Sequence, residues 1–385
     1  MDDERHENAF FYGIKVGLFK VGRREELMSK APKFLFVPVS SEEGIGEYMR
    51  SKILADEVVS RWPDAEIEFV LNSYAPYSQQ CPYTTHLVND TPTKRVKEVN
   101  ALITAFRPDV VIFDAAGRKA QLRHAHKCGA KVIFISQHKR KRSRGMKVER
   151  ALVTDSHWVV QPEFVMGDIS QFDKLKLNLI KRAFPIFTGS IFTQPSSLVQ
   201  QGLYTKYGVM PKQYLLYSAG SGGHSLKNQL AADLFAQVAQ AIFNQTGIPS
   251  LMVFGPNYPN ALPQLDGVTV IEQLSSVDFI NLLDSAQGAI LSGGDTLLQA
   301  IALKVPTLAV AVSKDQPSRI KQCVNEGLVL HCESETDVMV SQVTQLLQPS
   351  SSEQLRNKME SVGETKGLDI CMAEVARLLD AAPCQ

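Results

Sequence analysis

The stretch at residues 291–313, LSGGDTLLQAIALKVPTLAVAVS, constrains the fold more than any other part of the chain. Two apolar runs flank a Gly-Gly turn and a segment with helical spacing, which together predict strand, turn, helix and strand. A doubly wound sheet builds a nucleotide-binding crevice from such units, at the carboxyl ends of its parallel strands. The segment therefore predicts a parallel α/β sheet and places the chemistry of the chain at its edge.

The same alternation of apolar runs and helical segments occurs in two series, one from residue 33 and one from residue 213. The predicted fold class is therefore α/β, with two Rossmann-like doubly wound parallel-sheet domains facing a cleft. A polar loop at residues 72–92 is long enough to be a lid or an acceptor loop. The predicted divisions are an N-terminal extension (1–32), an N-terminal Rossmann-like domain (33–192), a linker (193–208), a C-terminal Rossmann-like domain (209–351) and a C-terminal helix (352–385).

Composition excludes several classes of protein. The chain has 385 residues, of which 44% are hydrophobic, enough for two cores. Its 41 Lys and Arg nearly balance its 40 Asp and Glu, so no overall field favours nucleic acid, and no such partner is expected. The six cysteines lack metal-ligand or C-x-x-C spacing and are predicted to be free thiols. An acidic N-terminus unlike a signal peptide, and no run long enough to span a membrane, predict a cytoplasmic protein.

Two glycine-rich turns follow strands of the second series. The turn GSGGH at residues 220–224 leads toward a helix expected at 228–245, and SGGDT at 292–296 leads directly into another. Exposed N–H groups at such turns can hold a diphosphate, although a tight strand-to-helix turn would also use these glycines. Two such turns at one sheet edge converge on one crevice. The candidate binding residues are Gly220, Ser221, Gly222, Gly223, His224, Ser292, Gly293, Gly294, Asp295 and Thr296.

Three further polar residues are expected in the same crevice. Gln299 follows the second turn, where its amide can donate to and accept from a ribose diol. Asp315 and Gln316 follow the next strand, and a carboxylate beside an amide suits sugar hydroxyls. The alternatives are an ordinary exposed helix residue for Gln299 and a helix cap for Asp315 and Gln316.

Together these residues resemble the donor half of the GT-B glycosyltransferases, especially the UDP-glycosyltransferases and the N-acetylglucosaminyltransferase that makes lipid II. Gly293 and Gly294 occupy the family's turn, Val305 and Pro306 precede the strand, and Asp315-Gln316 matches the loop at the donor sugar. Three positions depart from the pattern: Gln299 replaces an acidic residue, Lys304 a glycine and Arg319 an asparagine. The resemblance implies a UDP-sugar donor and inversion at the anomeric carbon.

Three residues of the first series are candidate catalytic bases. Glu47 stands near the end of the first strand, where the resemblance would place a histidine, and Asp114 and His138 close later strands. A carboxylate whose pKa burial has raised can take the proton of an acceptor hydroxyl. A carboxylate favoured by the helix dipole is the alternative for Glu47. The sequence does not separate the three.

A basic run, HKRKRSR at residues 138–144, is the strongest local charge feature. Because it follows a strand at the expected catalytic edge, Lys139 through Arg144 could meet an anionic acceptor or an anionic membrane surface. A solvated loop is the alternative.

The sequence therefore predicts a glycosyltransferase of the cytoplasm or of the inner face of the membrane, transferring a sugar from a nucleotide to a hydroxyl acceptor, with lipid-linked and anionic acceptors among the candidates. No D-x-D pair stands in a suitable turn, so neither a metal nor another cofactor is expected, and backbone N–H groups would meet the leaving-group charge. The alternatives are a nucleotide-sugar hydrolase or epimerase on the same fold, and a non-enzymatic nucleotide- or lipid-binding protein.

Overall fold

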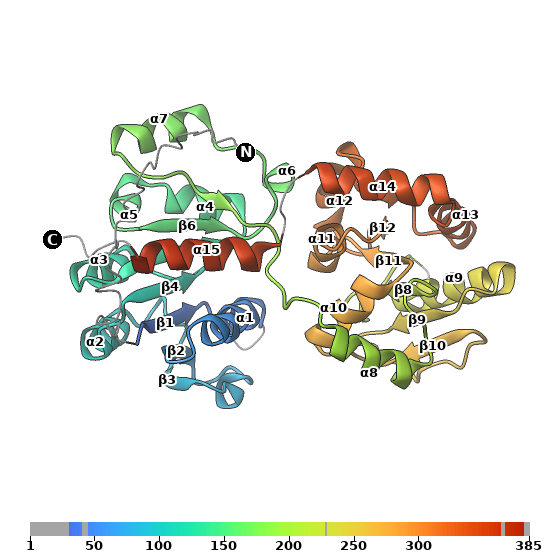
Figure 1. Ribbon diagram of the computed structural model, residues 1–385, viewed down its shortest axis with the longest axis horizontal. Helices are drawn as coiled ribbons and strands as arrows, with labels where there is room; N and C mark the ends of the chain where they lie inside the picture. The colour runs from blue at the N-terminus through green and yellow to red at the C-terminus, as the bar shows by residue number, and fades with distance from the viewer. Residues whose placement is uncertain (1–30, 41–44, 228, 363–365, 381–385) are drawn as a thin grey trace, which may run out of the picture.

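The computed structural model describes residues 31–40, 45–227, 229–362 and 366–380, and its elements form two lobes (Figure 1). Each lobe is built around one parallel sheet, which confirms the predicted fold class. Most of the N-terminal extension expected at 1–32 lies outside the described residues. No helix within these ranges is long and apolar enough to cross a membrane.

The N-terminal lobe contains a seven-stranded sheet. Its strands are β1 (Lys33–Pro38), β2 (Glu66–Asn72), β3 (Thr84–Val88), β4 (Val110–Asp114), β5 (Lys131–Ser136), β6 (Ser156–Val159) and β7 (Ile186–Phe187). They lie in the order β3-β2-β1-β4-β5-β6-β7. Because the order reverses between β1 and β4, the loops after these strands diverge and leave a crevice.

The C-terminal lobe contains a six-stranded sheet with the same kind of reversal. Its strands are β8 (Leu215–Ser218), β9 (Ser250–Val253), β10 (Val268–Ile271), β11 (Gly288–Ser292), β12 (Thr307–Val310) and β13 (Leu330–His331). Their order is β10-β9-β8-β11-β12-β13, so the second crevice lies at the ends of β8 and β11.

Helices cover both faces of each sheet. Those of the N-terminal lobe are α1 (Gly46–Arg61), α2 (Val96–Phe106), α3 (Lys119–Lys127), α4 (Lys139–Gly145), α5 (Val148–Ala151), α6 (Glu163–Met166) and α7 (Gln171–Leu179). Those that follow are α8 (Ser197–Tyr207), α9 (Ala231–Thr246), α10 (Ser276–Ser285), α11 (Asp295–Ala302), α12 (Gln316–Asn325), α13 (Thr336–Leu346), α14 (Pro349–Ser361) and α15 (Gly367–Asp380). Side-chain alternation along β1 places Phe34 and Phe36 in one core with α1 and α15, and Leu35 and Val37 in another with α2 and α3.

The single helix expected near the C-terminus is instead two helices that pack on different lobes. In α14, Leu355 and Met359 enter the core of the C-terminal lobe, whereas Leu368 and Met372 of α15 enter the core of the N-terminal lobe beside α1. Both halves have apolar residues at helical spacing, so the sequence pattern predicted one helix where the structure has two. The last described helix, α15, therefore packs beside the first, α1 (Figure 1).

Two loops expected from the sequence also contain regular elements. The loop at 72–92 includes a 3-10 turn, η1 (Ser78–Gln80), and β3, which pairs with β2 at the sheet edge. The linker at 193–208 includes α8, which packs on α10 of the C-terminal lobe. The crossing between lobes is thus shorter than expected, and Ser190 on it pairs with the returning chain, where the N–H of Gly367 donates to the Ser190 carbonyl at 3.0 Å.

Candidate functional site

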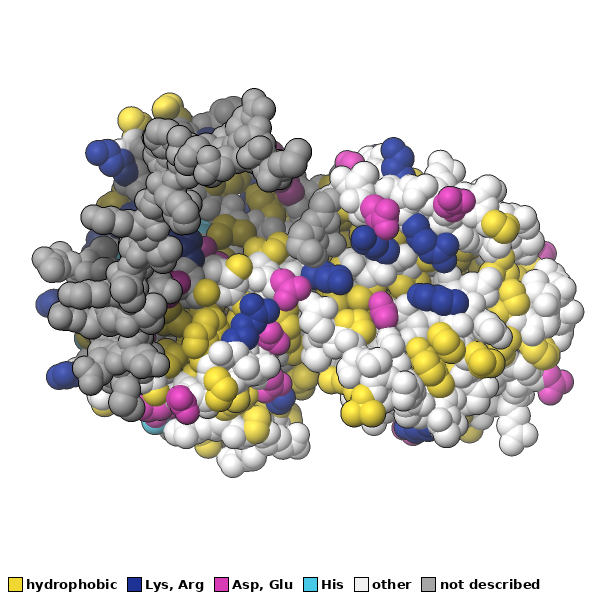
Figure 2. Space-filling model, viewed as in Figure 1, with side chains coloured by type: hydrophobic (Ala, Val, Ile, Leu, Met, Phe, Trp, Pro, Cys, Tyr) yellow, Lys and Arg dark blue, Asp and Glu magenta, His cyan; other side chains and the backbone are white. Residues whose placement is uncertain are grey.

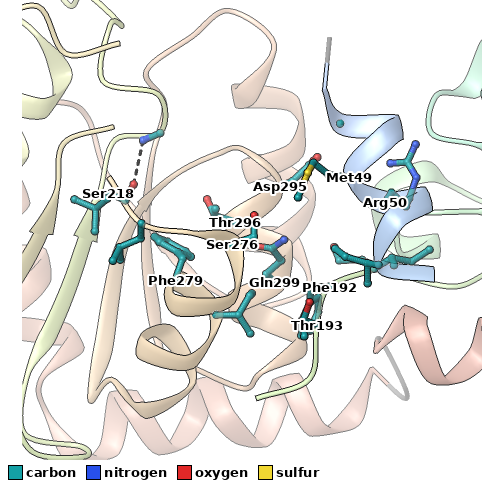
Figure 3. A pocket seen from close by; sticks show the side chains of 18 of the residues that line it. Met49, Arg50, Phe192, Thr193, Ser218, Ser276, Phe279, Asp295, Thr296 and Gln299 are labelled. Atoms are coloured by element: carbon teal, nitrogen blue, oxygen red, sulfur yellow. Dashed lines mark hydrogen bonds between the residues drawn. The ribbon is translucent and has the colours of Figure 1, made fainter. Parts of the chain in front are cut away.

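A cavity of about 390 Å³ lies between the lobes, where the loops after strands of both sheets meet (Figure 3). The N-terminal lobe contributes α1, the end of β5 and the crossing segment. The C-terminal lobe contributes the loops after β8, β9 and β10 together with α10 and α11. Since both sheets reverse their strand order here, the two topological crevices face the same space.

The turn after β8 is shaped by close backbone packing. Gly220 lines the cavity, and Gly222 beside it has a φ of 91°. A Cβ on Gly222 would lie 2.4 Å from the Phe254 carbonyl oxygen, and one on Gly255 would lie 2.4 Å from that of Gly220. The turns after β8 and β9 therefore touch through backbone atoms, and a side chain at either of these two glycines would separate them. The following helix, expected from residue 228, begins at Ala231, so the turn does not adjoin a helix N-terminus.

The turn after β11 is held from behind by α12. The side-chain oxygen of Gln316 accepts from the N–H groups of Gly293 and Val312, at 3.1 and 2.9 Å. Arg319 donates to the Gly293 carbonyl at 2.7 Å. A Cβ on Gly293 would lie 2.8 Å from that of Gln316, so this glycine is needed for packing. Gln316, expected at the donor sugar, thus directs its oxygen to the backbone of the turn.

Helix α11 begins at Asp295, immediately after this turn, and its first residues line the cavity (Figure 3). These are Asp295, Thr296 and, one turn later, Gln299. The Asp295 side chain is 57% exposed and lies 3.5 Å from Arg319. Its other carboxylate oxygen accepts from the amide of Gln137 in the opposite lobe at 3.4 Å. Asp295 therefore links the two walls of the cavity.

Helix α1 contributes Gly46, Met49, Arg50 and Ile53 to the N-terminal wall, beside the crossing segment at residues 190–193. Arg50 makes a two-pronged ion pair with Asp114, in which its Nε and one terminal nitrogen bind the two carboxylate oxygens at 2.8 and 2.7 Å. Asp114 is fully buried; burial raises its pKa, and the Arg50 guanidinium opposes that shift. Among the described lining residues, Arg50 is the one basic side chain and Asp295 the one acidic side chain.

The three candidate bases have different surroundings. Glu47 is half-buried in the first turn of α1, and its carboxylate lies 3.8 Å from the Lys141 ammonium. His138 is exposed, next to the lining residue Gln137. Asp114 has both oxygens on Arg50 and no exposed surface, so it does not reach an acceptor hydroxyl in this arrangement.

The other predicted binding residues surround the cavity without lining it. Ser292 is buried beneath Gly220, since a Cβ on Gly220 would lie 3.3 Å from the Ser292 hydroxyl oxygen. Asp315 is exposed, and a hydrogen bond from the Ser313 hydroxyl at 2.6 Å lowers its pKa. Of the predicted set, the lining residues are Gly220, Asp295, Thr296 and Gln299; those outside the lining are Ser221, Gly222, Gly223, His224, Ser292, Gly293, Gly294, Asp315 and Gln316.

Comparison with known proteins finds similar structures but no similar sequence family. No protein-family model and no curated protein sequence matches the chain. Among solved structures, it is similar to the glycosyltransferase of kitacinnamycin, with 16% identity and a TM-score of 0.60 over 90% of this chain and 99% of that one. It is also similar to glycosyltransferase VinC in complex with DTDP, with 14% identity and a TM-score of 0.59 over 90% and 99%. The chain has the GT-B fold.

The same architecture is also similar to the UDP-GlcNAc 2-epimerase from Neisseria meningitidis bound to UDP-GlcNAc. The identity is 12% and the TM-score 0.55, over 90% of this chain and 100% of that one. Structures named as transferases and as an epimerase therefore share this GT-B architecture, and similarity at these identities establishes the fold without the reaction.

The basic run of this GT-B chain forms α4 rather than a loop, and not all of its charges face solvent. Arg142 is buried and donates to the carbonyls of Gly167 and Asp168 at 2.5 and 3.3 Å. Arg150, also buried, donates to the Gly117 carbonyl at 2.5 Å. These two arginines hold loops of the N-terminal lobe, whereas Lys139, Arg140 and Arg144 are exposed.

The sequence did not single out several residues of the GT-B cleft. Gly255 and Pro256 follow β9, so the rule that selected the other two turns also applies to them. Met49, Arg50 and Ile53 line the cavity at helical spacing on α1, but their pattern is indistinguishable from that of a core-facing stripe. The described residues contain no group of three or more His, Cys, Asp or Glu arranged to hold a metal ion.

Proposed function

We propose that the protein is a glycosyltransferase that uses a nucleotide-sugar donor. The observation that carries the proposal is the cavity between the lobes, where the Gly220 turn and the first residues of α11 form one wall and α1 forms the other. A wall of backbone turns suits a nucleoside diphosphate, and a facing wall of side chains suits an acceptor. DTDP in the VinC structure and UDP-GlcNAc in the epimerase structure support a nucleotide ligand, and UDP-sugars are the first to test.

In this proposal the C-terminal wall holds the donor. The diphosphate lies between the Gly220 turn and the N-terminus of α11, where N–H groups and the helix dipole meet its charge without a metal. Gln299 binds the ribose, and Asp315 with Gln316 forms the edge of the sugar subsite. The bonds from Gln316 to Gly293 and Val312 give it a second role, which is to keep the turn in place.

The reaction is an inverting transfer. The acceptor oxygen forms a bond to the anomeric carbon while the bond from that carbon to the diphosphate breaks, and the acceptor proton passes to a base. Glu47 is the proposed base because it is adjacent to the lining residue Gly46, and His138 is the second choice. Asp114 holds Arg50 in place. As the basic group of the lining, Arg50 supports an acceptor that carries an anionic group, whether free or lipid-linked. We infer that the reaction takes place in the cytoplasm or at the inner face of the membrane.

The experiment is product analysis by mass spectrometry with a panel of UDP- and dTDP-sugars, with and without pooled hydroxyl acceptors. We expect release of the nucleoside diphosphate to depend on acceptor, and the new glycoside to have the opposite anomeric configuration. Glu47→Gln should reduce turnover by roughly a hundredfold or more while retaining nucleotide binding. Sugar release at the same rate without acceptor would contradict the proposal.

The similarity to a UDP-GlcNAc 2-epimerase favours a second candidate, an epimerase or hydrolase of nucleotide sugars. This enzyme would convert UDP-GlcNAc alone, giving an epimerised or free hexosamine without acceptor. A third candidate is a protein that binds the nucleotide without catalysis, in which case the donor would protect the fold from heat but remain intact.

A further inference from the structure

Helix α7 exposes a row of large apolar side chains. Phe172, Leu175 and Leu179 are 74%, 59% and 75% exposed. With a rotation of about 100° per residue around the helix axis, the three side chains fall within a stripe about 60° wide on the helix surface. Leu177 lies on the opposite side of the helix. Leu177 is buried in a small core with Met146 and Ala151, so α7 packs on the α4–α5 region through one side and presents its apolar row outward. Phe172, Leu175 and Leu179 are called the α7 row below.

Basic residues lie next to the α7 row. Residues 139–147 and 168–182 together contain ten Lys and Arg and two Asp. Both aspartates pair within the second segment, Asp168 with Lys174 and Asp173 with Lys176. The basic helix α4 adjoins the start of this segment, because Arg142 donates to the carbonyls of Gly167 and Asp168. At the other end of α7, Lys181 and Arg182 follow directly.

The space-filling view shows how this end of the molecule is formed. Hydrophobic side chains protrude at the upper left of Figure 2, where Figure 1 places α7, with a Lys or Arg side chain beside them. Exposed apolar side chains on a short helix, with basic groups around them, have the chemistry of a helix that lies in the interface of an anionic bilayer.

We propose that the α7 row and the surrounding basic residues dock the protein on an anionic phospholipid surface. The apolar side chains enter the headgroup region, and the exposed basic side chains of α4 (Lys139, Arg140 and Arg144), with Lys181 and Arg182 after α7, contact lipid phosphates. Three side chains cover at most a few hundred Å², below the roughly 800 Å² per partner that a stable dimer needs, so a lipid surface fits better than a second copy. This surface is separate from the cavity, and the proposal does not depend on the reaction catalysed there.

The test is co-sedimentation of the full chain with vesicles of phosphatidylglycerol and phosphatidylcholine, or of phosphatidylcholine alone. We expect binding to the anionic vesicles that weakens at high salt. The triple variant Phe172→Ser/Leu175→Ser/Leu179→Ser should lose at least about tenfold of that affinity. The matched control is Leu198→Ser, a residue of α8 that is 79% exposed.

A second readout places the contact on α7. Phe172→Trp should show a blue-shifted fluorescence with anionic vesicles, whereas Leu198→Trp should not. Equal binding by the triple variant and the unmodified chain would overturn the proposal. The proposal would also be overturned if the unmodified chain did not bind vesicles and formed a dimer that the triple variant converted to a monomer. That result would assign the α7 row to contact with a second copy.

Discussion

The two lobes bury different kinds of polar side chain. Among the described residues, every buried Asp, Arg or His lies in the N-terminal lobe: Asp114, Arg142, Arg150 and His157. The buried polar side chains of the C-terminal lobe are neutral: Ser218, Ser250, Asn281, Ser285, Ser292, Thr307 and Gln316. Burying an ion is costly unless it is paired, whereas a hydrogen-bonded amide or hydroxyl is cheaper to bury. The buried charged groups therefore make the stability of the N-terminal lobe more dependent on pairing and on acid pH than that of the C-terminal lobe.

This difference matches the roles proposed for the two walls. The C-terminal wall is shaped by neutral groups such as Gln316, so its backbone N–H groups keep one geometry over a range of pH. The N-terminal wall brings a fixed charge, Arg50, which a fully buried carboxylate orients. Both lobes line one cavity, but substitutions in the two lobes are therefore expected to change the stability of the protein in different ways.

The largest effect is expected at the ion pair behind the N-terminal wall. Asp114→Asn leaves Arg50 without its partner, and breaking such a pair costs about 3–5 kcal/mol of unfolding free energy. Urea denaturation measures this value. The control is Glu360→Gln, which removes an exposed ion pair with Lys304 and should change stability by less than about 1 kcal/mol. Equal effects of the two substitutions would show that the N-terminal lobe does not depend on the buried pair.

The next effect is a dependence of stability on pH that originates in the N-terminal lobe. Burial lowers the pKa of His157 to about 3, and the charges of Arg142 and Arg150 act in the same direction. The folded state therefore binds fewer protons than the unfolded state between pH 6.5 and 3, and stability is lost as the pH falls through this window. This residue alone adds a slope of up to about 1.4 kcal/mol per pH unit.

Unfolding free energies measured from pH 7 to pH 4 check this expectation. His157→Gln should flatten the slope, whereas His138→Gln, at an exposed position, should leave it unchanged. An unaltered slope in His157→Gln would assign the acid sensitivity to other groups.

A smaller loss is expected from the neutral support of the C-terminal wall. Gln316→Ala leaves the N–H groups of Gly293 and Val312 without their acceptor, at a cost of about 1–3 kcal/mol. The cost should be independent of pH between 5 and 8, unlike the loss that originates at His157. Thermal unfolding against Gln345→Ala, an exposed glutamine on α13, provides the comparison.

The smallest effect concerns the ligand rather than the fold. Gln299→Ala should weaken nucleotide binding by about threefold to tenfold, the value of one hydrogen bond, with no change in stability. Gln299→Glu, which introduces the carboxylate expected here from the resemblance to GT-B glycosyltransferases, should bind at least as well as the unmodified chain. A Gln299→Ala variant with unchanged affinity would remove this residue from the ribose site.

The fold could be predicted because strand and helix periodicity is a local property. Helices α14 and α15 were merged because each has a stripe with the same spacing, and the sequence does not record that Leu355 and Leu368 enter different cores. Gln299 could be placed in the cavity because it follows a strand-end turn. The pairing of Arg50 with Asp114 joins helix α1 to the end of β4, 64 residues later, and no local pattern contains it.

Gln316 shows what residue type alone does not predict. Its amide predicts hydrogen bonding to a sugar, and the structure adds that its side-chain oxygen accepts from two backbone N–H groups. The direction of a side chain depends on tertiary neighbours, here the turn after β11. The basic run shows the same limit, because Arg142 has the same charge as the exposed Arg140 but is buried in loop contacts.

Isothermal titration calorimetry with UDP and dTDP tests the central claim most directly, namely that the C-terminal wall of the cavity binds a nucleoside diphosphate. The unmodified chain should bind at least one of them. The double variant Thr296→Val/Gln299→Ala should bind at least about tenfold more weakly, while Glu47→Gln on the opposite wall should bind as the unmodified chain does. Equal affinity in the double variant, or no binding of either nucleotide by the unmodified chain, would contradict the account.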